Sequence, residues 1–257
     1  MIDVCFIFRK MGLLSEIANE IELHSLEGIQ DCFHRGLNPN ALFKGRPLLE
    51  ELISEYTRGP RFKLCVKVFV DNGLQWPDPA LLAVLLDDST TLETCLKNDP
   101  ALINMAYSMK CAYTPLYKVS LLHICAEFNH VNCAQVLHNF GMDVNVTAGM
   151  DEHGFGGHTP VFHTVNQNGN HSLEMLHFLL DHGADTTLTV PGLIWGKGYD
   201  WETFIPAVNP VSYAMMGLLP QMHRNETTIS EVVTLLMEKS FGIRYIPVNI
   251  PCAYLKK

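Results

Sequence analysis

The sequence predicts an all-α solenoid of about six helix–turn–helix units. Three observations indicate this fold. Two short patterns alternate along the chain, the first of them recurs at a spacing that starts near 33 residues, and the later units are separated by segments long enough for loops. The copies of the first pattern begin near residues 13, 46, 78, 120, 159 and 209, so the later units carry insertions.

The first pattern predicts a helix at the start of each unit. It has a small or polar residue, then Pro or Leu, then apolar residues with Ala near the sixth place. Pro at the second place presets φ for the first helical turn, where its missing N–H costs nothing. The copies are residues 120–126, the clearest, then 78–84, 159–165, 209–215, 46–52 and 13–19.

The second pattern closes each unit with a short apolar helix that ends at Gly or Asn, followed by a turn. Residues 136–145 and 178–185 are its best copies. The Gly after the helix takes a left-handed conformation that other residues resist. We also expect Thr90 or Thr91 to cap the second helix of the third unit, with Glu93 completing a capping box.

These residues resemble the ankyrin repeat family. Residues 120–145 and 159–185 carry the resemblance almost completely, and it extends more loosely over about residues 13–242. The resemblance implies one repeat domain over residues 1–257, with a C-terminal cap at 241–257, and a general role in binding proteins. The family's usual His after Pro-Leu stands only at His123, where we expect a structural hydrogen-bonding role. A plain helical bundle is the alternative, but it has no reason to repeat the Pro start and the Gly end.

Composition and charge exclude several classes of protein. The formal charge of −9 argues against a nucleic-acid partner, which requires clustered Lys and Arg. No run of 18 apolar residues occurs, and the apolar run near the start is too short for a secretory signal. We therefore expect a cytoplasmic protein with no membrane contact. The eight cysteines show no C-x-x-C spacing and are expected to be free thiols.

Three inter-repeat loops are unusually long: residues 104–119, 146–158 and 188–208. Long loops on a rigid scaffold are often functional, and aromatic residues are enriched in binding hot spots. We expect a non-enzymatic, monomeric scaffold that binds a protein or peptide through its concave face and these loops. The candidate binding residues are Trp76, Tyr107, Tyr113, Phe155, Trp195, Tyr199 and Trp201. The same aromatics could instead cover the solenoid, as in a purely structural module of a larger assembly.

The sequence predicts no catalytic residue, no metal and no cofactor. The densest group of possible ligands is Asp151, Glu152, His153, His158 and His163, but its spacing matches no compact ligand motif. The glycine-rich segments resemble phosphate loops only superficially, and no nucleophile motif occurs. A metal-dependent enzyme or metal-binding protein that uses the loops within 146–204 remains the alternative.

Overall fold

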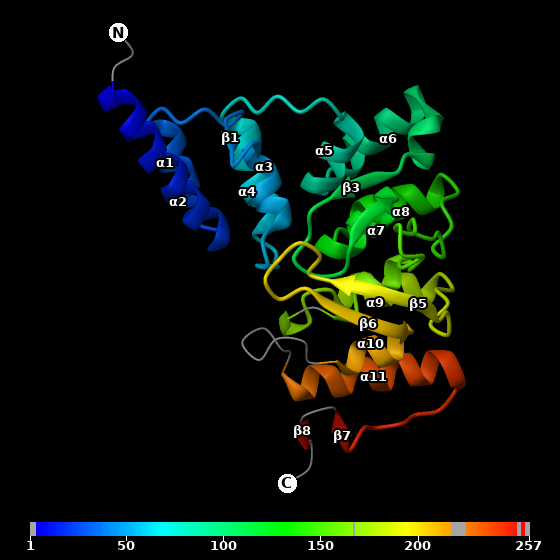
Figure 1. Ribbon diagram of the computed structural model, residues 1–257. Coiled ribbons are helices and arrows are strands. Elements are labelled where there is room, and N and C mark those ends of the chain that lie inside the picture. The colour runs from blue at the N-terminus through cyan, green and yellow to red at the C-terminus, as the bar shows by residue number, and fades with distance from the viewer. Residues whose placement is uncertain (1–3, 167, 217–224, 251–252, 255–257) are drawn as a thin grey trace.

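The computed structural model describes residues 4–166, 168–216, 225–250 and 253–254 (Figure 1). Helices make up about half of the chain and follow one another in pairs that stack from the N-terminal end toward the C-terminal end. The pairs are α1 (Val4–Glu22) with α2 (Leu26–His34), α3 (Leu48–Ser54) with α4 (Phe62–Asp71), α5 (Pro79–Leu86) with α6 (Ser89–Asn98), α7 (Leu121–Phe128) with α8 (Val131–Asn139), the 3₁₀ turn η2 (Pro160–His163) with α9 (Leu173–Asp181), and α10 (Pro210–Met215) with α11 (Glu226–Phe241).

The expectation of an all-α fold is not confirmed, because small antiparallel sheets accompany the helices. In the described part of the chain each sheet has two strands: β1 (Leu42–Phe43) with β2 (Arg46–Pro47), β3 (Tyr107–Met109) with β4 (Leu116–Val119), β5 (Val190–Trp195) with β6 (Thr203–Val208), and β7 (Asn249–Ile250) with β8 (Ala253–Tyr254). The longest sheet lies where the sequence predicts only a loop. Its register runs from Val190 opposite Val208 to Trp195 opposite Thr203.

Side-chain caps set the starts of several helices. Asp78 accepts a hydrogen bond from the Leu81 N–H at 2.8 Å and so begins α5, with Pro79 in the first turn. The expected threonine cap of α6 is wrong. Helix α6 begins at Ser89, before either threonine, so Asp88 is the N-cap and accepts from the Thr91 N–H at 3.0 Å.

An asparagine bond recurs between neighbouring repeats. The Asn145 side chain accepts from the Asp185 N–H at 2.7 Å and donates to the Gly183 carbonyl at 3.1 Å. Asn40 makes the same pair of bonds with Gln75 N–H and the Gly73 carbonyl, at 2.7 and 2.9 Å. In both places the asparagine follows the glycine turn of one repeat and ties it to the glycine turn of the next.

We expect Asn145→Ala to lower the free energy of unfolding by about 1 kcal/mol, because it removes two bonds that join repeats. Urea denaturation would measure the change. Asn139→Ala is the matched control, since the Asn139 side chain only accepts from Gln135 one turn earlier on the surface of α8. Equal losses in the two variants would contradict a role for Asn145 in joining repeats.

Six cysteines whose side chains are described are free thiols: Cys32, Cys65, Cys95, Cys111, Cys125 and Cys133. Cys5 and Cys252 lie outside the residues whose side chains the structure describes. Among the described helices, none combines the length and apolarity that crossing a membrane requires.

Candidate partner-binding face

The β5–β6 hairpin extends from the fifth helix pair back to the second (Figure 1). At its tip, the Tyr199 hydroxyl donates to the Ser54 carbonyl at the end of α3, at 2.5 Å. The backbone of the segment after β3 provides two more contacts. The Gly196 N–H donates to the Tyr113 carbonyl at 2.9 Å, and the Trp201 indole N–H donates to the Ala112 carbonyl at 3.2 Å. The hairpin is therefore a fixed part of the surface.

Aromatic rings and a lysine form the tip of the hairpin. The Tyr199 and Trp201 rings stack with centroids 4.6 Å apart and 22° between their planes. The Lys110 ammonium lies 3.7 Å from the centre of the Tyr199 ring, a cation–π contact. Gly196 allows the chain to turn here, because its φ is +63° and a Cβ would lie 2.6 Å from the Trp201 ring.

A second pair of rings lies on the outer side of the hairpin. Phe155, from the 146–158 loop, and Phe204 have ring centroids 4.7 Å apart. A Cβ at Gly192 would lie 2.6 Å from the Phe204 ring and 2.9 Å from the Phe155 ring, so both rings need glycine there. Phe204 is 49% exposed. Asp151 binds the loop to the hairpin by accepting from Lys197 Nζ at 2.9 Å. We call the surface formed by Lys110, Phe155, Tyr199, Trp201 and Phe204 the hairpin face.

The structure separates the seven candidate residues into two groups. Three are buried and support the loops: Tyr107, Tyr113 and Trp195, of which Trp195 is only 2% exposed. Four are half-buried: Phe155, Tyr199 and Trp201 on the hairpin face, and Trp76 in the linker between α4 and α5. Sequence reasoning did not select Phe204, because the apolar run F-I-P-A-V has no alternation that would distinguish an outward from an inward side chain.

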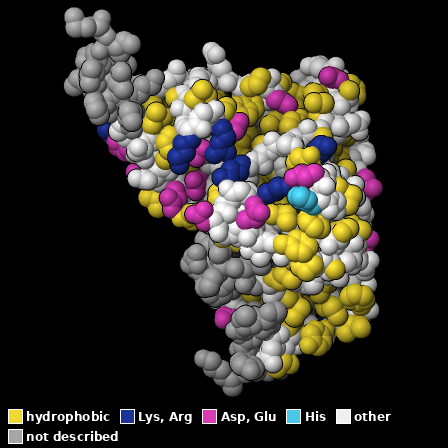
Figure 2. Space-filling model, viewed as in Figure 1, with side chains coloured by type: hydrophobic (Ala, Val, Ile, Leu, Met, Phe, Trp, Pro, Cys, Tyr) yellow, Lys and Arg dark blue, Asp and Glu magenta, His cyan; other side chains and the backbone are white. Residues whose placement is uncertain are grey.

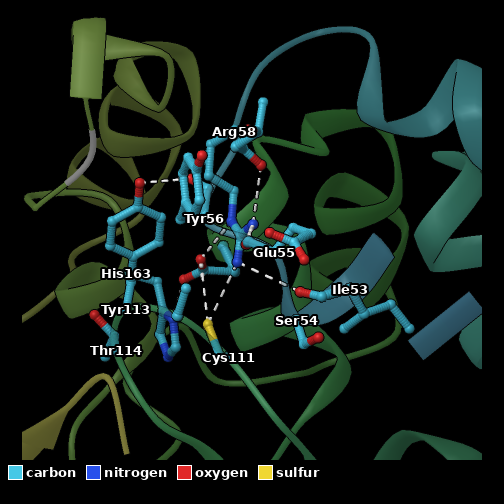
Figure 3. Close-up of polar contacts among 12 residues, drawn as sticks. Ile53, Ser54, Glu55, Tyr56, Arg58, Cys111, Tyr113, Thr114 and His163 are labelled. Carbon is cyan, nitrogen blue, oxygen red and sulfur yellow. Dashed lines mark hydrogen bonds and ion pairs between the residues drawn. The ribbon is translucent and has the colours of Figure 1, made fainter. Parts of the chain in front are cut away.

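A buried charge network lies behind this face and connects the N-terminal helix pairs to α7 (Figure 3). Arg58 Nε donates to Glu127 Oε1 at 2.8 Å, and Glu127 Oε2 lies 2.8 Å from His163 Nδ1. Burial raises the pKa of the Glu127 carboxyl, but the attraction of Arg58 and the hydrogen bond to His163 outweigh it and hold that pKa below its usual value. Sequence reasoning missed this pair. Glu127 could have been found as the single charge in the apolar helix 121–128.

Arg58 closes the turn between α3 and α4. Its guanidinium donates to the carbonyls of Ile53, Glu55 and Thr57 and to the Cys111 sulfur, the last at 3.4 Å. Each of the three guanidinium nitrogens thus has a hydrogen-bond partner, and the Arg58 side chain is 2% exposed. The Arg58 charge is therefore fixed by bonds within the protein and is not available to a ligand.

Hydrogen bonding determines the tautomers of the adjacent histidines. His158 Nε2 lies 3.1 Å from the Pro115 carbonyl and 3.2 Å from His163 Nε2. A carbonyl only accepts, so His158 Nε2 carries the proton, and His163 accepts at Nε2 and donates from Nδ1 to Glu127. His123 donates from Nε2 to the His158 carbonyl at 3.1 Å, which confirms its structural role. Burial, followed by the nearby His163, lowers the pKa of His123 to about 3.

The histidine cluster does not converge. His153 projects into solvent beside Glu152, while His158 and His163 are buried. Within the described residues, no group of three or more His, Cys, Asp or Glu side chains is arranged to hold a metal ion.

A polar groove of about 500 Å³ lies between the start of α4, the α7–α8 turn and the start of α9. Among its charged residues, Arg58 pairs with Glu127 and Lys63 pairs with Asp87, whereas Glu174 is exposed at the start of α9. Lys63 Nζ pairs with Asp87 Oδ2 at 2.9 Å, and Asp87 Oδ1 accepts from the Cys133 N–H at the start of α8. The paired charges in the groove thus join neighbouring repeats, whereas the hairpin face carries aromatic side chains that are partly exposed to solvent.

Comparison with known proteins identifies the repeat. The family model for ankyrin repeats matches residues 80–190 in three copies. Proteins of this family generally act as protein–protein interaction modules. No curated protein matches the chain significantly. The matched residues run from α5 to α9 and include the β3–β4 hairpin and the 146–158 loop, which supply Lys110 and Phe155. Tyr199, Trp201 and Phe204 lie beyond the matched stretch. The ankyrin repeats that the sequence predicts are therefore confirmed over residues 80–190.

Proposed function

We propose that the chain is a non-enzymatic scaffold that binds a partner protein through the hairpin face. The observation that carries the proposal is the docked β5–β6 hairpin, which holds half-buried Tyr199 and Trp201 and the exposed Phe204 on fixed backbone. Aromatic side chains held in this way lose little conformational freedom on binding. The partner would contact the concave side of the array through Tyr199 and Trp201 and the outer side of the hairpin through Phe155 and Phe204.

Several parts of the proposal rest on the sequence and the repeat pattern. Recurrence of the asparagine bond at Asn40, before the matched stretch, supports one array of six repeats that starts ahead of residue 80. The buried Tyr107, Tyr113 and Trp195 would support the face without touching the partner, and Trp76 would act separately. The monomeric state, the cytoplasmic location and the lack of nucleic-acid partners remain predictions.

We expect Phe204→Ala to weaken partner capture by roughly tenfold while leaving the melting temperature nearly unchanged, because Phe204 is half-exposed. Quantitative affinity capture from an extract of the source organism, with thermal unfolding of each variant, would test this. Leu64→Ala is the control, since Leu64 is 45% exposed on α4, outside the hairpin face. Capture that survives Phe204→Ala, or falls equally with Leu64→Ala, would refute the proposal.

A further inference from the structure

Positive charge gathers next to the aromatic side chains, although the chain as a whole carries a formal charge of −9. Figure 2 shows Lys and Arg side chains across the middle of one face of the molecule, interspersed with Asp and Glu side chains, and hydrophobic side chains below them. We call Lys44, Arg46, Lys110, Lys118 and Lys197 the cation band. They come from the β1–β2, β3–β4 and β5–β6 hairpins, which follow one another along the array.

Contacts place Lys110, Lys118 and Lys197 beside the hairpin face. Lys110 lies over the Tyr199 ring, with its Cε 3.9 Å from the point where a Cβ on Gly198 would be. Lys118 borders the 146–158 loop, because its carbonyl accepts from the Gly149 N–H at 3.0 Å. Lys197 reaches the same loop through Asp151.

The band keeps uncompensated charge. Two members are paired, Arg46 with Glu51 and Lys197 with Asp151. Among the side chains that the structure describes, Lys44, Lys110 and Lys118 are exposed and form no ion pair. Lys110 and Lys118 lie over tyrosine rings, which hold the ammonium groups in position without neutralising them.

An apolar surface adjoins the charges. Phe204 and Met150 are each 49% exposed, and Phe155 lies against Phe204. Three free ammonium groups are too few to hold a nucleic acid, which is bound through many phosphate contacts. A segment that carries carboxylates next to an apolar side chain would complement both the free ammonium groups and the adjoining apolar surface.

We propose that the cation band and the hairpin face bind an extended acidic segment of the partner protein, one that carries an apolar side chain beside its carboxylates. The proposal rests on the binding function argued above and specifies the chemistry of the partner. The carboxylates would pair with Lys110 and Lys118, and the apolar side chain would lie on Phe155 and Phe204.

Fluorescence anisotropy with a labelled 12-residue probe peptide would test this. The probe consists of Asp and Glu with a central Phe–Leu pair. We expect the double variant Lys110→Glu with Lys118→Glu to bind at least about tenfold more weakly at low salt, because two attractive pairs become repulsive. Lys67→Glu with Lys97→Glu is the matched control, since these lysines lie on α4 and α6 and change the net charge equally. Circular dichroism would confirm that both variants fold.

Three further probes separate the apolar contribution to binding from the electrostatic contribution. Replacing Phe–Leu by Ala–Ala in the probe should weaken binding by about threefold or more, because apolar burial is lost. Absence of probe binding, equal binding to both double variants, or equal binding of a probe with Lys in place of the acids would overturn the proposal. A thymidine 12-mer that binds as tightly as the peptide would overturn it too. If the probe does not bind while capture of the natural partner still depends on Phe204, the hairpin face binds a partner but the proposal that it recognises an acidic segment is wrong.

Discussion

Glu127→Gln is expected to lower the free energy of unfolding by about 3 kcal/mol, because it leaves the Arg58 charge buried without its counter-charge. Glu127 and Arg58 are 1% and 2% exposed, so water cannot replace the lost carboxylate. The hydrogen bond to His163 is weakened at the same time. Chemical denaturation of the variant and the parent would measure the loss.

Two comparisons make that expectation specific. Asp71→Asn removes a surface pair with Lys67 and should change stability by less than about 0.5 kcal/mol. The double variant Arg58→Met with Glu127→Leu should recover most of the loss from Glu127→Gln, because apolar side chains can fill the same buried space. A loss from Glu127→Gln no larger than that from Asp71→Asn would show that the network contributes little to joining the N-terminal pairs to α7.

Acidification is expected to destabilise the protein strongly between pH 6.5 and about 4, because several histidines are buried without charge. Burial is the main cause that lowers the pKa of His24 to about 4, of His130 to about 4 and of His123 to about 3. It also holds the pKa of His158 well below its ordinary value. These histidines therefore bind protons near pH 6.5 in the unfolded chain, but only at much lower pH in the folded protein.

The stability linked to these histidines is fully present above pH 6.5 and falls as the pH drops below it. Each contributes a loss of about 1.4 kcal/mol by pH 5.5, so the four together remove about 6 kcal/mol. Urea denaturation at pH 7.5, 6.5 and 5.5 would follow the loss. His123→Asn should reduce the pH dependence relative to that of the parent protein. A stability that is constant from pH 7.5 to 5.5 would contradict the account.

The sequence predicts the repeating part of the fold well because each repeat uses local rules. Pro at the second place and a left-handed Gly after the second helix are readable from spacing alone. The insertions follow no repeat rule, so the sequence predicts a loop at 188–208 where the structure has a hairpin with Leu193, Trp195 and Ile205 on one buried side. Where an insertion docks depends on contacts distant in sequence, such as Tyr199 with Ser54.

The candidate site could be predicted only in part, because the orientation of its side chains also depends on contacts distant in sequence. Aromatic content identified the loop that carries Tyr199 and Trp201, but the sequence could not show that Trp195 faces inward while Phe204 faces outward. That division depends on strand register, and a shift of one residue would exchange the two faces. The Arg58–Glu127 pair joins residues far apart in the chain, so no local pattern predicts that these two side chains meet.

Site-specific photo-crosslinking tests the central claim, that the hairpin face binds a partner protein, most directly. A photoreactive phenylalanine would replace Phe204, and in a second protein it would replace Leu64 on α4, which has a similar exposure. Mass spectrometry would identify the proteins that each position captures in an extract of the source organism. The account predicts a partner captured from position 204, absent from position 64, and lost when Trp201→Ala is added. The same proteins captured from both positions, or capture from position 64 alone, would contradict it.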